Sequence, residues 1–311
     1  MKKIFAIYYN RDIDENGQLY PEETNRQFNE AVFDLSNKLT EKGIKFIMIT
    51  RQNDYVGNGQ FFGFWEPSSN RRFVCIRRLI APGLIFDKGH IDFNDGLLNI
   101  FNNHSFARLG RNKYTQAVIA KDFVPRTQLV CNEGDYEKVL GTIKTDQIVL
   151  KPLDENGGRG VALYDRNDLK SNQVFPVIAQ EFIETKSGID GMVEGRHDIR
   201  LYIVDGAVVM CSIRQPKKGG WLSNTCQGGT IHFFNKSKIS PELLEFARPI
   251  IEKFNKMGGK FYSVDFMHGD IGWRMVEMND RPGMPALYQD TDGAIEKFYE
   301  KMTNMIVRDI S

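Results

Sequence analysis

The dipeptide Asp205-Gly206 is the feature that most restricts how this chain can fold. It separates two largely apolar runs, residues 199–205 and 207–213. An Asp-Gly pair between two such runs favours the two-residue turn that joins antiparallel strands. We therefore predict a β-hairpin here, and with it an antiparallel sheet in the C-terminal part of the chain.

Further elements follow from periodicity and from turn residues. Strands are expected at 4–9, 44–49, 84–87, 147–151, 161–164, 177–181, 262–267 and 273–278, and helices at 21–42, 112–121, 241–257 and 293–307. Strand, helix, strand at the start of the chain indicates a parallel unit with a right-handed crossover. The aromatic stretch 55–72 is expected to be a long loop or a hairpin that covers core. The fold class is α/β with α+β lobes, divided at 1–104, 105–183 and 184–311.

Composition excludes several classes of protein. Hydrophobic residues make up 41% and charged residues 26% of the 311, with a net charge of +1. This balance argues against nucleic acid or an acidic membrane as a partner. The four cysteines are scattered without metal-type spacing, which favours reduced thiols in a cytoplasmic protein. The apolar run after Lys2-Lys3 is short and is interpreted as a buried strand rather than a signal peptide. Homo-oligomerisation stays open.

A candidate metal site lies near the C-terminus. Glu277 and Asn279 alternate on one predicted strand, so their side chains share a face. Asp265 lies on the preceding strand. Two carboxylates and an amide oxygen suit Mg²⁺ that is also held by phosphate oxygens. The alternative is a polar, exposed face of a hairpin.

A candidate phosphate site surrounds Lys151. This lysine ends a strand, and the loop after it contains Gly157, Gly158 and Gly160. A lysine can reach nucleotide phosphates as a point charge, and glycines let backbone amides approach a polyphosphate closely. The alternative is an ordinary flexible hairpin loop.

The predicted hairpin carries charged residues at its open end. Asp198 and Arg200 alternate onto one face, opposite Ile199, and Arg214 ends the second strand. Asp198 can accept ribose hydroxyls, and either arginine can clamp a phosphate or a carboxylate. A cross-strand salt bridge is the structural alternative for each of them.

Weaker candidates complete the set. Glu181, Phe182 and Ile183 can offer backbone groups to an adenine edge, and Gly228 and Gly229 can hold an acyl-phosphate oxygen through backbone amides. Arg11 follows the first strand, where an α/β lobe commonly presents ligand-binding residues.

The order of these signals along the chain resembles the ATP-grasp superfamily, and in particular bacterial glutathione synthetase and the ribosomal-protein glutamate ligases. The resemblance covers about residues 105–285. Its most specific parts are Val149-Leu150-Lys151-Pro152, Ser223-Asn224 with Gly228-Gly229, and Glu277-Met278-Asn279 with Pro282-Gly283. It implies an N-terminal lobe followed by two lobes that clamp ATP.

The resemblance also implies a role for each candidate. Lys113 and Lys151 would contact ATP phosphates beneath the glycine loop, and residues 181–183 would line the adenine pocket. Asp198 would meet the ribose. The transferring phosphoryl group would be stabilised by Arg200 and Arg214, with Asn224 beside it. Arg281 would contact the substrate. Two Mg²⁺ ions, or Mn²⁺ in their place, would be held by Asp265, Glu277 and Asn279.

The implied activity is an ADP-forming carboxylate–amine ligase. ATP would convert a carboxylate into an acyl phosphate, and an amine from an amino acid or peptide would then form an amide. Three alternatives remain open: a kinase that phosphorylates a small-molecule hydroxyl on the same nucleotide site, a non-catalytic ATP-binding module, and a ligase that modifies a ribosomal peptide. The first hundred residues match no motif, so the substrates are not identified.

Overall fold

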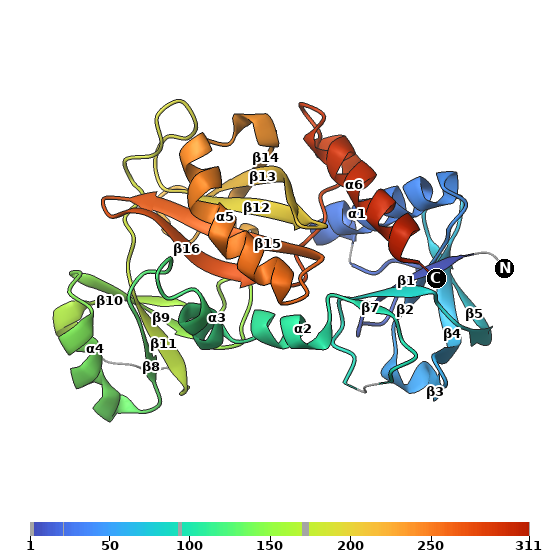
Figure 1. Cartoon of the computed structure of the whole chain (residues 1–311), viewed down its shortest axis with the longest axis horizontal. Helices are drawn as coiled ribbons and strands as arrows, with labels where there is room; N and C mark the ends of the chain where they lie inside the picture. The colour runs from blue at the N-terminus through green and yellow to red at the C-terminus, as the bar shows by residue number, and fades with distance from the viewer. Residues whose placement is uncertain (1–2, 21, 93–94, 170–173, 311) are drawn as a thin grey trace. The chain divides into compact units, whose positions relative to one another are not determined.

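The computed structural model describes residues 3–20, 22–92, 95–169 and 174–310. The chain forms two compact units, which are described separately (Figure 1). Unit 1 comprises residues 1–104, 259–261 and 281–311, and unit 2 comprises residues 105–258 and 262–280. Each unit therefore contains residues from distant parts of the sequence.

Unit 1 is built on a sheet with a parallel centre. Strand β1 (Ile4–Tyr8) lies between β2 (Lys45–Ile49) and β6 (Leu84–Asp87), and β7 (Ile100–Phe101) pairs with β6. Helix α1 (Glu22–Glu41) connects β1 to β2, which confirms the predicted strand–helix–strand unit. The last four residues of β1, of β2 and of β6 are all buried, as is typical of parallel strands in a sheet covered by helices.

The aromatic stretch of unit 1 extends this sheet with antiparallel strands. Strand β4 (Gln60–Pro67) pairs with β3 (Tyr55–Gly57), with β2 and with β5 (Phe73–Ile80). Phe61 and Phe64 are 0% and 1% exposed, which confirms that the stretch covers core. Strand β5 was not predicted, because most of its side chains are exposed and show no simple alternation.

The C-terminal helix completes unit 1. Helix α6 (Ala294–Asp309) packs beside α1. Its bounds are within two residues of the helix predicted at 293–307. Its Tyr299 hydroxyl hydrogen bonds to the carbonyl oxygens of Ala31 at 2.9 Å and Pro285 at 2.7 Å. These bonds attach the C-terminal segment to the helix that follows β1.

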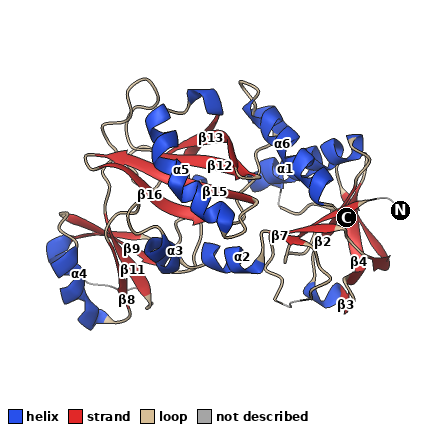
Figure 2. Cartoon of the chain, in the orientation of Figure 1, coloured by secondary structure: helices blue, strands red, loops and turns tan. Residues whose placement is uncertain are grey.

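The smaller sheet of unit 2 is antiparallel, in the order β10-β9-β11-β8. Its strands are β8 (Thr127–Val130), β9 (Gln147–Pro152), β10 (Ala162–Asp165) and β11 (Val177–Glu181). Helix α4 (Tyr136–Thr142) contributes Val139 to the core of this sheet. Helices α2 (His104–Gly110) and α3 (Lys113–Ile119) precede it (Figure 2). Strand β8, α2 and α4 were not predicted, because each is too short to show a clear period.

The larger sheet of unit 2 has the order β14-β13-β12-β15-β16. Its strands are β12 (Asp198–Val204), β13 (Ala207–Gln215), β14 (Thr230–Asn235), β15 (Phe261–Gly269) and β16 (Gly272–Asn279). Val204 pairs with Ala207, so Asp205-Gly206 is the two-residue turn that the sequence predicts. The φ angles of these two residues are 50° and 78°, as a type I′ turn requires.

Helix α5 (Pro241–Lys256) covers one face of the larger sheet (Figure 1). It begins as predicted: the Ser240 side chain accepts a hydrogen bond from the Leu243 N–H at 3.1 Å, and Pro241 follows at the first helical position. Ile199, Leu201 and Ile203 of β12 point into the core beneath α5. Period two then places the alternate residues of β12 on the opposite face, which is the polar one.

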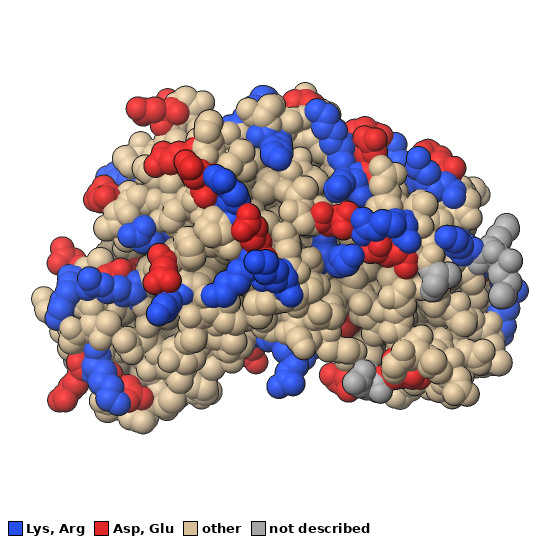
Figure 3. Space-filling view, viewed as in Figure 1, with Lys and Arg blue, Asp and Glu red and all other residues tan. Residues whose placement is uncertain are grey.

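Short 3₁₀ helices occur in both units. They span Gln52–Asp54, Glu133–Asp135, Arg166–Asp168, Thr225–Gln227, Lys236–Lys238 and Leu287–Gln289. On the face shown in Figure 3, acidic and basic side chains are interspersed, in agreement with the net charge of +1. Among the helices that the structure describes, none combines the length and the apolar character needed to cross a bilayer.

Candidate functional site

Four charged side chains form a buried network on the polar face of the larger sheet. Arg214 on β13 donates from Nε and Nη2 to Asp198 Oδ1 and Oδ2 on β12, at 2.7 and 2.9 Å. Its Nη2 also donates to Asp265 Oδ2 on β15 at 2.6 Å. Arg200 donates to both oxygens of Asp265 at 2.7 and 2.8 Å. The two negative charges of the carboxylates are thus matched by the two positive charges of the guanidiniums.

The register of the sheet explains this network. Asp198 pairs directly with Arg214 across β12 and β13, and Asp265 pairs with Glu277 across β15 and β16. Asp198, Arg214 and Asp265 are only 5%, 6% and 4% exposed. The prediction that Asp198 and Arg200 share a face opposite Ile199 is confirmed. The salt bridges considered as the structural alternative are also present.

The network holds Asp265 in its ionised form. Burial by itself raises the pKa of Asp265, but Arg200 and Arg214 outweigh it and lower the pKa to about 2. Each arginine engages its aspartates through Nε and Nη2. The aspartates therefore bind both guanidiniums through the same edge, the one formed by Nε and Nη2.

Glu277 and Asn279 extend the network along β16. Glu277 Oε1 lies 3.7 Å from Lys113 Nζ. With the Asn279 amide oriented to suit its neighbours, its nitrogen donates to Glu277 Oε1 and its oxygen accepts from Arg200 Nη2, both at 3.2 Å. The two residues that the sequence places on one face therefore do contact each other.

These oxygen donors can accommodate Mg²⁺. Among the described residues, no three His, Cys, Asp or Glu side chains converge as a preformed cation cage. Asp265 already accepts three hydrogen bonds from arginines, whereas the Glu277 carboxylate is 22% exposed and more available. A site with few protein oxygens fits Mg²⁺, which usually keeps waters and binds substrate phosphates as well.

Lys151 is presented by β9 from the smaller sheet. Its Nζ donates to Gln180 Oε1 on β11 at 2.6 Å, and Gln180 Nε2 in turn donates to Thr127 Oγ1 at 2.9 Å. Burial lowers the pKa of Lys151 to about 8, against the opposing effect of Glu277 and with a further lowering by Lys113. A neutral amide therefore positions this lysine without neutralising it.

The glycine loop after β9 meets a second loop from the larger sheet. Gly158 has a φ of +76°, and a Cβ there would lie 2.8 Å from Asn224 Oδ1. Lys113, at the start of α3, donates from Nζ to the Glu155 carbonyl oxygen within the same loop. The loop and Asn224 are therefore packed closely, and a side chain at position 158 would separate them.

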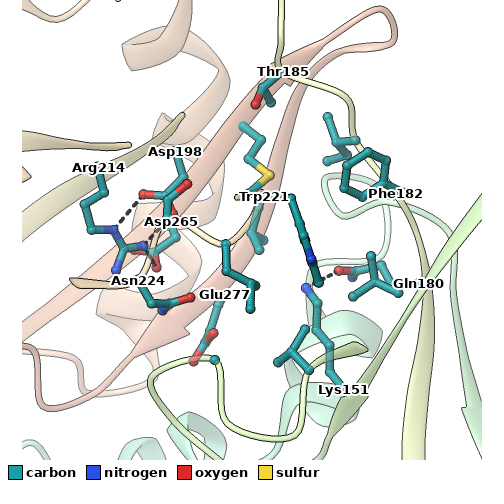
Figure 4. Close-up of a pocket in the computed structure, with 18 of the residues that line it drawn as sticks. Lys151, Gln180, Phe182, Thr185, Asp198, Arg214, Trp221, Asn224, Asp265 and Glu277 are labelled. Atoms are coloured by element: carbon teal, nitrogen blue, oxygen red, sulfur yellow. Dashed lines mark hydrogen bonds and ion pairs between the residues drawn. The ribbon is translucent and has the colours of Figure 1, made fainter. Parts of the chain in front are cut away.

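Aromatic side chains border the other end of the site. Phe182, just after β11, and Trp221, in the segment after β13, have ring centroids 6.1 Å apart in an edge-to-face arrangement. Glu181 Oε2 accepts a hydrogen bond from the Arg126 N–H at 3.0 Å. In the view of Figure 4, Trp221 stands between the side with Phe182 and Gln180 and the side with Asp198 and Asp265.

These residues surround one pocket, whose cavity volume is about 90 Å³ (Figure 4). Sites for ligands of nucleotide size usually measure roughly 300–1,000 Å³. Trp221 and the neighbouring Leu222 line the pocket. Entry of a nucleotide would therefore require lining residues to move, and Trp221 is the largest side chain among them.

The structure brings most of the predicted residues to this pocket. Those that line it are Lys113, Lys151, Gly158, Glu181, Phe182, Ile183, Asp198, Arg214, Asn224, Asp265 and Glu277. Arg200 and Asn279 adjoin it through the hydrogen bonds described above. Gly157 and Gly160 lie on the same loop as Gly158. Gly228 and Gly229 are not among the described residues that line the pocket, and Arg11 and Arg281 belong to unit 1.

Several lining residues were not predicted as site residues. Gln180 and Trp221 are the most informative, and Thr185, Arg196 and Met267 also contribute. A glutamine in an apolar strand signals a buried hydrogen-bond partner, since Gln180 is only 3% exposed. Trp221 lies two residues before Ser223-Asn224 of the predicted motif, and this closeness along the chain is the only signal that could have marked it.

A sequence model of the prokaryotic glutathione synthetase ATP-grasp domain matches residues 113–280, more than half of the chain. The chain belongs to this ATP-grasp family. The matched segment begins at Lys113 and ends just after Asn279, so it contains both lysines, the ion network and Glu277. The resemblance inferred from the sequence is thereby confirmed.

Relatives within the family carry the name of a ligase. The chain is 28% identical over 193 residues to a probable alpha-L-glutamate ligase of Vibrio vulnificus, and 26% identical over 189 residues to one of Trichodesmium erythraeum. Each alignment covers 57% of this chain and 58% of the relative. The chain thus spans under two thirds of the length of these relatives.

Solved structures show the same ATP-grasp fold over the whole chain. The D-Ala:D-Ser ligase of Enterococcus faecalis aligns with a TM-score of 0.64 at 15% identity, covering 100% of both chains. A peptide-associated ATP-grasp ligase of Chryseobacterium gregarium aligns with a TM-score of 0.63 at 12% identity, covering 100% of this chain and 98% of that one. The predicted fold class is confirmed.

Proposed function

We propose that the protein is an ATP- and Mg²⁺-dependent carboxylate–amine ligase that forms an amide or peptide bond through an acyl phosphate. One observation carries the proposal: two lysines, an arginine held by two buried aspartates, and Glu277 all face one pocket. This is a site for transferring a phosphoryl group between oxyanions, because each cation lowers the cost of bringing negative charges together.

In this proposal, Lys113 and Lys151 contact the phosphates of ATP. Lys151 is held by Gln180, so its ammonium group is positioned before the substrate arrives. The glycine loop closes over the phosphates and excludes water, which would otherwise hydrolyse the acyl phosphate. Residues 181–183 and the aromatic pair Phe182 and Trp221 border the adenine, and Asp198 lies near the ribose.

The arginines stabilise the reacting groups. A carboxylate oxygen attacks the γ-phosphorus as the bond to ADP breaks. The amine nitrogen then attacks the acyl carbon, phosphate leaves, and the nitrogen gives up a proton to solvent to become the amide. The phosphoryl group carries negative charge both while it is transferred and when it leaves as phosphate. Asp198 and Asp265 hold the guanidiniums of Arg214 and Arg200 in fixed orientations, so little reorganisation is needed when that charge develops. Asn224 lies beside the glycine loop and can donate to the same group.

The metal ligands in the proposal are Asp265, Glu277 and Asn279. Bound Mg²⁺ would neutralise phosphate charge and align the phosphoryl group for transfer. Glu277 is the principal protein ligand in this arrangement, because the arginines already occupy much of Asp265. Two ions, and Mn²⁺ in place of Mg²⁺, form part of the proposal.

We also propose that the chain is organised in three lobes, at 1–104, 105–183 and 184–311, and that the protein is cytoplasmic. Cys75, Cys131 and Cys211 are free thiols, which supports a reducing compartment. The substrates would be an amino acid or peptide carboxylate and an amine. The proposal of a peptide substrate draws on the structurally similar ligase of Chryseobacterium gregarium, which was solved in complex with a leader and core peptide.

One experiment separates this proposal from a kinase on the same site. Purified protein with ATP and Mg²⁺ is incubated with pooled amino acids and peptides, and both phosphate release and product mass are measured. A ligase gives a product equal in mass to the summed substrates minus water. A product that is heavier by one phosphate and needs no amine would refute the ligase assignment. Tight ATP binding without turnover on any pool would favour a binding module.

A further inference from the structure

A second cavity lies in unit 1, and none of its described lining residues also lines the pocket discussed above. It measures about 200 Å³. Its described lining residues are Tyr9, Tyr20, Phe28, Ala31, Val32, Lys88, Arg281, Gly283 and Met284. Two of these are cations, two are phenols and the others are apolar or glycine. No carboxylate is among them.

The topology of unit 1 places this cavity where α/β sheets commonly bind ligands. The chain passes from β1 to β2 on one side of β1 and later returns to β6 on the other side. The strand order therefore reverses between β1 and β6. Tyr9 and Lys88 are the first residues after these two strands. Ligands typically bind at the carboxyl ends of the strands at such a switch point.

The two loops at this point are fitted closely together. A Cβ at Gly89 would collide with the backbone nitrogen of Asn10, so the approach of the loops requires glycine there. Asp87 accepts hydrogen bonds from the N–H groups of Gly89 and Ile91, both at 3.0 Å. Lys88 Nζ donates to the Pro282 carbonyl oxygen at 2.8 Å. This hydrogen bond attaches the Lys88 side chain to the segment that carries Arg281.

The cavity offers donors and positive charge. Tyr20 and Tyr9 share one hydrogen bond of 2.7 Å between their hydroxyl oxygens, which uses only one of the two phenolic protons. Burial, with Tyr20 beside it, raises the pKa of Tyr9 well above 10, so this phenol stays protonated. The Arg11 guanidinium stacks over the Tyr20 ring at 4.6 Å, and Lys88 Nζ lies 5.7 Å from the Tyr9 ring centroid. An anion is the ligand that this set complements.

We propose that this cavity is a carboxylate-binding subsite that takes the free carboxylate of an amino acid, or of a peptide terminus, with an apolar side chain. The proposal rests on the proposed ligase function and specifies one of its substrates. Lys88, Arg281 and the Tyr9 hydroxyl contact the carboxylate, because Tyr20 already donates its own proton to Tyr9. Phe28 and Met284 contact the apolar side chain. A volume of about 200 Å³ matches a single residue rather than a long peptide segment.

The test measures binding and requires no turnover. The full chain is saturated with Mg²⁺ and a non-hydrolysable ATP analogue. L-leucine, L-methionine and L-phenylalanine are titrated calorimetrically, each beside its C-terminal amide. We expect at least one acid to bind ten or more times more tightly than its amide. Equal binding of acid and amide, or binding of none of the three acids, would overturn the subsite.

Variants assign the effect to this cavity. Lys88→Gln should weaken binding of the acid at least tenfold while leaving the amide unchanged. Lys42→Gln is the matched control, because it removes the same charge from an exposed position. Tyr9→Phe keeps the ring and should weaken the acid severalfold, so the test stands if Lys88→Gln fails to fold. Full affinity for the acid in folded Lys88→Gln or Tyr9→Phe protein would refute the assignment.

The nucleotide analogue is titrated in the same series. If the analogue does not bind, the ligase function fails, and the acid and amide titrations are repeated without it to test the subsite. If the analogue binds normally but acids are not preferred, only the subsite fails.

Discussion

Replacing Asp265 by asparagine tests the buried network directly. Both oxygens of Asp265 accept hydrogen bonds from guanidiniums, at 2.6 to 2.8 Å. Asparagine has almost the same shape, but one of its terminal atoms is an NH₂ group. In either amide orientation, that NH₂ group faces an arginine donor. The substitution also changes the net charge of the four side chains from zero to +1.

The expected loss of stability is large. The carboxylate side chain of Asp265 is 6% exposed, and those of Arg200 and Arg214 are 14% and 7% exposed. Removing one partner of a buried ion pair leaves an uncompensated charge and costs roughly 3–5 kcal/mol. The free energy of unfolding of the protein should fall by about that amount.

Urea unfolding monitored by circular dichroism measures this change. With a slope of about 2–3 kcal/mol per molar urea, the midpoint of unfolding should fall by about 1–2.5 M. Glu277→Gln is the control, since this carboxylate is 22% exposed and has one ion pair at 3.7 Å. It should change the free energy of unfolding by less than about 1 kcal/mol. An Asp265→Asn protein as stable as that control would refute the argument.

The pH dependence of stability provides an independent check. Asp265 has a folded pKa of about 2, below its ordinary value of 3.8. Its stabilising effect is therefore complete above about pH 4 and is lost as the pH falls from 4 to 2. The difference corresponds to about 2 kcal/mol. Asp265→Asn should remove this part of the acid sensitivity, and an unchanged acid profile would contradict the assignment.

Three further predictions concern the nucleotide pocket. Glu277→Gln should abolish turnover without unfolding the protein, as measured by ADP release and circular dichroism; retained activity would remove Glu277 from the metal site. Affinity for ATP should fall as the pH rises through about 8, where Lys151 loses its proton, and Gln180→Glu should move this fall to higher pH, because a carboxylate partner raises the pKa of the lysine. Binding of ATP should change the fluorescence of Trp221, because the 90 Å³ pocket has to open; Trp221→Phe should lose this change, and an identical signal from that variant would show that Trp221 does not move.

The elements of the chain were largely predictable, because local pattern determines them. The Asp205-Gly206 turn and the start of α5 at Ser240-Pro241 rest on backbone preferences of a few adjacent residues. Strand β5, by contrast, has mostly exposed side chains and was missed. An edge strand of this kind is specified by its partner β4 rather than by its own pattern of burial.

The site was predictable as a set of candidates but not as a set of contacts. Strand periodicity correctly placed Asp198 and Arg200 on one face. It did not indicate that Arg214 bridges Asp198 and Asp265, because that contact joins three strands through the register of a whole sheet. Gln180 and Trp221 were not among the predicted site residues. Only the pairing of β11 with β9 brings Gln180 to Lys151, and only the packing of the segment after β13 brings Trp221 to the pocket.

The sequence alone determined the order of the elements, the ATP-grasp family and the residue types that could carry phosphoryl chemistry. These properties depend on short-range periodicity, on turn residues and on motifs made of residues that are close together in the sequence. The tertiary structure decided which charged side chains pair and which residues Glu277 contacts. It also placed Tyr9, Tyr20, Lys88 and Arg281 around one cavity. Those relations join residues that are distant in the chain, and they arise only when strands pair in a specific register and loops pack against one another.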